Sequence, residues 1–114
     1  MFATMIQGGT TPAQRDDMNR AVTESLIPAL RSETGFRGAV NLEDRSTGHG
    51  VMLILSDTED QALRLPSSPA LHKALADILR ISTGERAPAS CWHVNVVQLD
   101  SEAQELAATP SGAI

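Results

Sequence analysis

Apolar residues repeat along this chain with two different periods, and the change between them separates strands from helices. Phe2 to Gly8 form a short apolar run that predicts a first strand. Phe36 to Arg45 alternate apolar and polar residues, which predicts a half-exposed strand with Phe36, Gly38, Val40 and Leu42 on one side. His49 to Ser56 are more uniformly apolar and predict a strand buried on both faces. Cys91 to Leu99 predict the final strand.

A helical period follows the first strand. Thr11-Pro12 is a good helix start, and Gln14 completes a capping-box pattern. Pro28 lacks an N–H group, so it is expected to kink the helix or end its regular part. Gly35 is the expected C-terminal cap. One apolar face is made by Met18, Val22, Ser25, Leu26, Ala29 and Leu30.

The helical period returns after the second apolar strand. Asp57 is expected to cap a short helix through Leu63, which Pro66 interrupts. Ser68-Pro69 restarts a longer helix that Gly84 ends. Its apolar face is Leu71, Leu75, Ile78 and Leu79. We therefore expect one domain over residues 1–100 and a partly disordered tail over 101–114, in which Ser101 caps at most one helical turn.

The predicted order is strand, helix, a hairpin of two strands, helix, strand. This is the ferredoxin-like split βαβ arrangement of the α+β class, an antiparallel sheet with helices on one face. Both alternating sets of the third and last strands are apolar, so the face without helices is expected to be apolar too. A homodimer that packs the two sheet faces together is the simplest way to cover it.

Composition narrows the functional classes. The 114 residues carry a net charge of −5, and eight of the nine basic residues are arginines spread along the chain, which argues against nucleic acid and an anionic membrane surface. Only 3% of residues are aromatic and there is no tyrosine, which excludes a stacking platform and a catalytic phenol. The single Cys91, with no signal peptide and no transmembrane run, predicts a cytoplasmic protein.

Three short motifs carry a family resemblance: Leu26 to Arg31 with its central proline, Gly35 to Ala39, and Asp44 to Gly48. Together they resemble the dimeric α/β-barrel superfamily. More narrowly, residues 1–100 are similar to small antibiotic biosynthesis monooxygenase-like proteins. The resemblance implies a dimer without a cofactor. Proteins of this fold include cofactor-free oxygenases of polyketide quinones, haem-degrading enzymes and many of unknown role.

The chain departs from that family at the aromatic positions. Leu55 to Glu59 lack the tryptophan that members often carry there, and the missing tyrosine removes part of the quinone-oxygenase set. In the haem-degrading branch, a tryptophan and a histidine fall where this chain has Leu65 and Leu75.

His93 and Asn95 are the candidate catalytic pair, because residues two apart on a strand share a face. His93 would act as a base near neutral pH, and Asn95 would orient a substrate oxygen. The alternative is that both are ordinary polar residues facing solvent or a dimer partner.

Trp92, Gln7 and His72 are the candidate substrate-binding residues. Trp92 would wall a ligand pocket, with a core or interface anchor as the alternative. Gln7 on the first strand would hold a substrate oxygen, and His72 would reach a pocket mouth unless it is simply solvated. No metal is expected, because the histidines have no ligand spacing and Cys91 has no cysteine partner.

The leading hypothesis is a homodimer that binds a small apolar molecule between sheet and helices. The resemblance extends this to a cofactor-independent monooxygenase of phenol- or quinol-type substrates. The alternatives are a non-catalytic ligand-binding or stress-associated dimer with a degenerate pocket, which the missing aromatic residues favour, and a haem-degrading enzyme.

Overall fold

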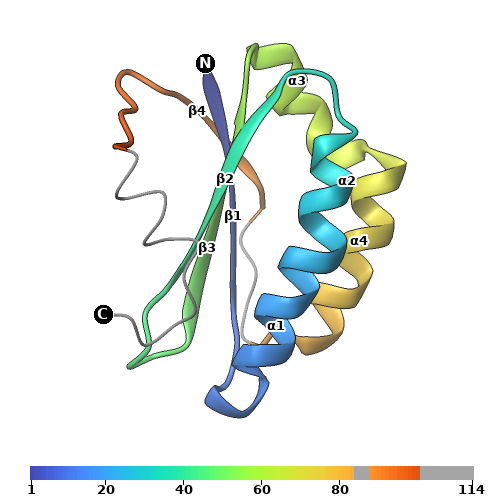
Figure 1. Ribbon diagram of the computed structural model, residues 1–114, viewed down its shortest axis with the longest axis vertical. Helices are drawn as coiled ribbons and strands as arrows, with labels where there is room; N and C mark the ends of the chain where they lie inside the picture. Colours follow the sequence, from blue (N-terminus) through green and yellow to red (C-terminus); the bar gives the residue numbers. More distant parts are fainter. Residues whose placement is uncertain (84–87, 101–114) are drawn as a thin grey trace.

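The computed structural model describes residues 1–83 and 88–100, and its elements follow the predicted order (Figure 1). The strands are β1 (Phe2–Gly9), β2 (Phe36–Glu43), β3 (His49–Ser56) and β4 (Ser90–His93). The helices are α1 (Arg15–Ala21), α2 (Ile27–Arg31), α3 (Glu59–Arg64) and α4 (Pro69–Ile81). Short 3-10 segments span Pro12–Gln14 and Leu65–Ser67, and a π-helical segment spans Val22–Leu26. The predictions for Gly84, for much of the loop after it and for the tail beyond residue 100 lie outside the described residues.

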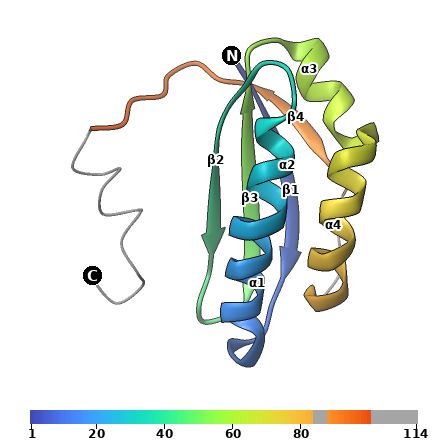
Figure 2. The same cartoon turned by 45° about the vertical axis from the view of Figure 1, so that its right-hand side comes forward.

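The four strands form one antiparallel sheet in the order β2-β3-β1-β4, which confirms the ferredoxin-like split βαβ topology. The helices lie on one face of this sheet, as Figures 1 and 2 both show. The other face, which we call the open face, is covered by no helix of the described residues.

The core lies between the sheet and the helices. Leu26, Leu30 and Leu71 from the helices meet Ile54 of β3, and each is almost completely buried. These are the apolar stripes that the helical period predicted. The buried Thr4 hydroxyl donates to the Ala62 carbonyl at 3.1 Å, so β1 is also tied to α3 by a polar contact.

Pro28 neither ends nor sharply interrupts the first helix, which continues to Arg31. Because Pro28 has no N–H, the carbonyl four residues before it loses its usual partner. The helix adapts by widening: the Ile27 N–H donates to the Val22 carbonyl, five residues back, within the π-helical segment. A π-bulge is a common way for a helix to absorb such an irregularity.

Three of the predicted helix caps differ in the structure. The N-cap of α3 is Thr58, not Asp57. Thr58 Oγ1 accepts from the Gln61 N–H at 3.2 Å, and Gln61 Oε1 accepts from the Thr58 N–H at 3.1 Å. Thr11 makes no capping bond to the backbone, because its first turn is a 3-10 turn and its hydroxyl contacts Gln14 Oε1 instead. The Ser68 cap is confirmed. Gly35 has a left-handed backbone, but α2 ends at Arg31 with Ser32 as its C-cap, so Gly35 lies in the turn that follows the helix.

Thr58→Ala is expected to lower the free energy of unfolding by about 1 kcal/mol, because it leaves the Gln61 N–H without its acceptor. Thr11→Ala is the matched control, since that hydroxyl caps no backbone group, and its expected cost is clearly smaller. Urea unfolding of both variants measures the difference. Equal losses would show that the capping box adds nothing.

A register shift in β2 corrects the predicted faces of that strand. Phe36 pairs with Ser56, but Gly38 pairs with Leu55, so Arg37 is an extra residue. Phe36 therefore packs on the helix side, although the alternation had placed it with Val40 and Leu42. Those two apolar residues lie on the open face, and the polar residues between and after them face the helices.

The turn between β2 and β3 lies at Ser46-Thr47-Gly48, as predicted. Asp44 accepts from the hydroxyl of Ser46 at 2.6 Å and from its N–H at 2.9 Å, and these bonds lower the pKa of Asp44. Gly48 has φ +78°, and a Cβ there would come within 2.2 Å of the Thr10 carbonyl oxygen. The Thr10 N–H donates to the Gly48 carbonyl at 2.9 Å, so the turn closes against the end of β1.

The final strand is shorter than predicted, because β4 ends at His93 rather than Leu99. Its pairing with β1 starts at Met5 and reaches Phe2, where β1 itself begins, so later residues have little strand left to pair with. Residues 94–100 leave the sheet on the side away from the helices (Figure 2). We call them the arm. Val96 and Leu99 of the arm are 84% and 60% exposed.

Candidate functional site

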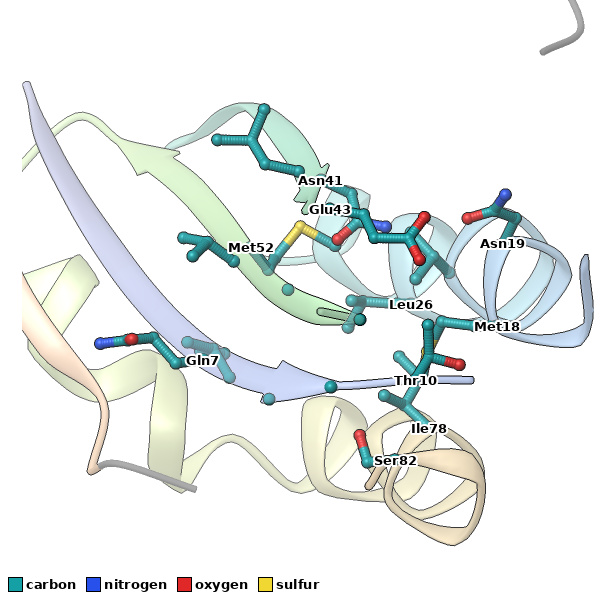
Figure 3. A pocket seen from close by; sticks show the side chains of 18 of the residues that line it. Gln7, Thr10, Met18, Asn19, Leu26, Asn41, Glu43, Met52, Ile78 and Ser82 are labelled. Atoms are coloured by element: carbon teal, nitrogen blue, oxygen red, sulfur yellow. The ribbon is translucent and has the colours of Figure 1, made fainter. Parts of the chain in front are cut away.

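A cavity of about 100 Å³ lies between the sheet and the helices, at the end of the sheet where β1 finishes (Figure 3). The sheet closes one side, and the first helix and α4 close the other. The apolar side chains that line it from these elements are Ile6, Met18, Val22, Leu26, Met52, Leu75, Ile78 and Leu79. The interior is therefore suited to an apolar ligand.

Polar side chains also line the cavity. They are Gln7, Thr10, Arg15, Asn19, Asn41, Glu43 and Ser82. Asn41 and Glu43 are there because the β2 register turns them toward the helices, with Asn41 opposite the buried Met52. Arg15 comes from the first turn of α1 and Thr10 from the end of β1. This arrangement gives the apolar cavity a polar rim.

An ion pair joins two elements at this rim. The Arg15 Nε–H is shared between both carboxylate oxygens of Glu43, at 2.7 and 3.0 Å, and the two side chains are only 22% and 19% exposed. The hydrogen bond to Glu43 raises the pKa of Arg15, with the negative charges of Glu43 and Asp16 adding to it and burial opposing it. Arg15 therefore stays charged, and the pair ties α1 to β2.

The Thr10 hydroxyl is a second distinctive feature of the rim. Its oxygen is buried but has no hydrogen-bond partner. Buried polar atoms without a partner are uncommon and costly in folded proteins. Because this oxygen has almost no accessible surface, Thr10 lines the cavity with its other atoms.

The structure brings His93 and Asn95 together, but not at the cavity. His93 Nδ1 lies 3.1 Å from Asn95 Oδ1, and both side chains are exposed. The ring of His93 packs edge-on against Phe2 at a centroid distance of 5.1 Å. Because β4 pairs with the first half of β1, the His93–Asn95 pair sits at the opposite end of β1 from Thr10. Its catalytic role stays a prediction.

The other predicted binding residues are more scattered. Gln7 is among the lining residues, but its amide points away from Thr10 and Ser82 in Figure 3. Trp92 lies opposite Ala3 on the open face, 54% exposed, and donates to Ser90 Oγ at 2.8 Å. His72 is exposed beside the Pro66 carbonyl and does not line the cavity. Their binding roles also stay predictions.

Arg15, Glu43, Asn41 and Thr10 were missed by the sequence analysis. Asn41 and Glu43 alternate with apolar residues, a pattern that normally marks a solvent-facing side. The signal that could have found them is the apolar content of the rest of the sheet. With both faces of β3 apolar, the polar side of β2 need not face water.

The described residues contain no group of three or more His, Cys, Asp or Glu side chains placed to hold a metal ion. Among residues 1–83 and 88–100, no helix is long and apolar enough to cross a membrane. Leu65 and Leu75, which stand at two positions of the haem-degrading pattern, both contribute to the apolar core.

A helix-covered antiparallel sheet with a cavity between its two layers defines an α+β protein of the ferredoxin-like class. Within that class, the chain has the fold of the antibiotic biosynthesis monooxygenase-like proteins. It matches no family model and no curated protein, so this likeness is one of structure.

Three solved structures illustrate the likeness. SnoaB, a cofactor-independent oxygenase from Streptomyces nogalater, superposes with a TM-score of 0.64 at 13% identity, over 87% of this chain and 98% of its own. Rv0793 from Mycobacterium tuberculosis gives 0.59 at 18% identity, over 87% and 95%. A candidate antibiotic biosynthesis monooxygenase from Bordetella bronchiseptica gives 0.68 at 10% identity, over 83% and 97%. At these identities the likeness shows the fold.

Proposed function

We propose that this protein binds a small apolar molecule in the cavity between sheet and helices. The observation that carries the proposal is the cavity itself, an apolar space with a polar rim that includes the Arg15–Glu43 ion pair. Binding sites are typically concave and apolar with a few placed polar groups. A packed core has no need for such a space, because voids lower stability.

We further propose that the protein is a homodimer that packs its open faces together. Val40, Leu42 and Trp92 are 40%, 49% and 54% exposed on this face. The arm adds further exposed apolar side chains on the same side of the sheet. Apolar surface of this extent marks an association site, and a two-fold arrangement buries both copies at once.

The four methionines allow both proposals to be tested in one sample. Met18 and Met52 line the cavity, whereas Met5 lies on the open face and Met1 at the chain terminus. In protein labelled with [13C-methyl]methionine, phenol is expected to shift the Met18 and Met52 signals. Dilution is expected to shift Met5. Phenol binding that leaves Met18 and Met52 unmoved would contradict the cavity as the site, and an unchanged Met5 signal would contradict the open-face dimer.

Cofactor-independent oxygenation is the activity that this fold supports best, because SnoaB carries it out on the same scaffold. A phenol or quinol would lose a proton, and its electron-rich anion would reduce O2 and form a hydroperoxide on a ring carbon. Loss of water would leave one oxygen atom in the product. The substrate itself supplies the electrons, so no cofactor is needed.

Oxygen uptake with a panel of quinols tests this activity and locates its base. His93 is the base predicted from the sequence, with Asn95 or Gln7 orienting the substrate oxygen. Loss of uptake in His93→Ala would support a site at the β4 edge, whereas full turnover in that variant would count against His93. A protein that binds phenol but consumes no oxygen would be the non-catalytic ligand-binding dimer. An unchanged Soret band on haem titration would exclude haem degradation.

A further inference from the structure

The charges that the described residues place around the cavity cancel, and this bears on which ligand it accepts. Among the described residues that line it, Arg15 and Glu43 are the charged ones, and they are paired with each other. The other polar lining residues carry neutral amides or hydroxyls. We propose that the cavity selects a neutral molecule of single-ring size with a hydroxyl or carbonyl oxygen at one edge, and that it rejects carboxylates. This inference rests on the proposed function.

The size limit follows from the volume. An engineered apolar cavity of about 150 Å³ holds one benzene molecule, whereas sites for drug-sized ligands start at about 300 Å³. A cavity of about 100 Å³ with an open mouth therefore suits one ring, with small adjustments of the lining side chains. Met18 and Met52 are flexible enough to make such adjustments. A second fused ring would need a lining residue to move out of the core.

The rim offers hydrogen bonds that an uncharged oxygen can use. Only the Nε–H of Arg15 is occupied by Glu43, and its two terminal nitrogens have no hydrogen-bond partner among the described residues. A phenol hydroxyl can accept from Arg15 and donate to Glu43. The site thus complements a group that both donates and accepts.

A carboxylate fits this rim poorly, although it would meet the same arginine. It would have to leave water and approach the Glu43 carboxylate, which already neutralises Arg15. A carboxylate also has no proton to donate to Glu43. Glu43 is therefore the residue that makes the site selective for neutral ligands.

Changing one charge of the pair is expected to change the ligand preference predictably. In the wild-type protein at pH 7, phenol should shift the Met18 and Met52 methyl signals at concentrations about tenfold or more below those that benzoate needs. Glu43→Gln makes the lining net positive and should strengthen benzoate binding about tenfold. Arg15→Gln makes it net negative and should favour benzylamine. 1-Naphthol should bind more weakly than phenol.

Asp17→Asn and Arg20→Gln are the matched controls, because they break an ion pair on the same helix that is exposed and away from the cavity. Neither should alter the ratio of phenol to benzoate affinity.

Equal affinity of the wild-type protein for phenol and benzoate, or an unchanged ratio in Glu43→Gln, would overturn the inference while ligand binding stands. Tight 1-naphthol binding would overturn the size limit. If neither benzene nor phenol shifts the Met18 and Met52 methyl signals, both this inference and the proposed ligand binding are wrong. The wild-type comparison decides the charge question even where a variant fails to fold.

Discussion

Leu42→Asp is expected to leave the protein monomeric at micromolar concentrations, where we expect the wild-type protein to be a dimer. Leu42 lies on the open face of the edge strand β2 and is 49% exposed in the single chain. A two-fold interface buries each substituted residue twice, so the variant places two unpaired carboxylates in apolar surroundings. A total cost of about 4 kcal/mol corresponds to about a thousandfold weaker association. Sedimentation equilibrium of the wild-type protein and the variant measures the two dimer dissociation constants.

Leu63→Asp is the matched control for this prediction. Leu63 is 56% exposed, so it is at least as accessible as Leu42, but it belongs to α3 on the helix side of the sheet. The same chemical change there should leave the dimer intact. A wild-type protein that sediments as a monomer would refute the dimer. If the dimer persists in Leu42→Asp but dissociates in Leu63→Asp, the interface lies on the helix side of the sheet.

The order and type of the elements could be predicted from the sequence because they depend on local signals. The periods of two and 3.6 separated strands from helices, and Ser68 marked a helix start that the structure confirms. Gly35 marked the end of the first helix too late, because that helix ends at Arg31. Pro28 predicted a local disturbance of the first helix, but a helix can respond to a proline either by breaking or by widening one turn. The chain widens one turn at Val22–Leu26 instead of breaking the helix, and the identity of a single residue does not distinguish these outcomes.

The faces of the strands were harder to predict, because they depend on pairing between distant segments. One extra residue at Arg37 moves Phe36 to the other side of the sheet, and no local feature of the alternation marks that bulge. β4 ends where its partner β1 begins, although the apolar pattern continues to Leu99. That continued pattern is better explained by an apolar arm that leaves the sheet.

The candidate site depends on the same long-range pairing. Glu43 and Asn41 come from β2, Arg15 from α1 and Thr10 from the end of β1, so the rim exists only once the sheet register and the helix packing are known. His93 and Asn95 attracted attention because their chemistry is suggestive and their spacing is local. The register of β4 places them at the other end of β1.

Leu26→Ala is expected to lower the free energy of unfolding by about 2–5 kcal/mol and to widen the ligand preference. Leu26 is 1% exposed, belongs to the main core and also lines the cavity. Removing its side chain therefore costs burial and adds empty volume beside an existing space. Urea unfolding measures the loss. Because a ligand that binds only the folded state stabilises it, 1-naphthol should restore more stability to this variant than to the wild-type protein.

Leu63→Ala is the control, since it makes the same change at an exposed position of α3 and should cost less than about 1 kcal/mol. It should leave the responses to phenol and 1-naphthol unchanged. A large loss of stability in Leu26→Ala without any gain in 1-naphthol binding would mean that the surrounding side chains collapse into the space. The cavity would then be a packing defect that the core closes when it can. A gain in 1-naphthol binding would instead show that the rigid sheet and the first helix hold the cavity open, as a binding site requires.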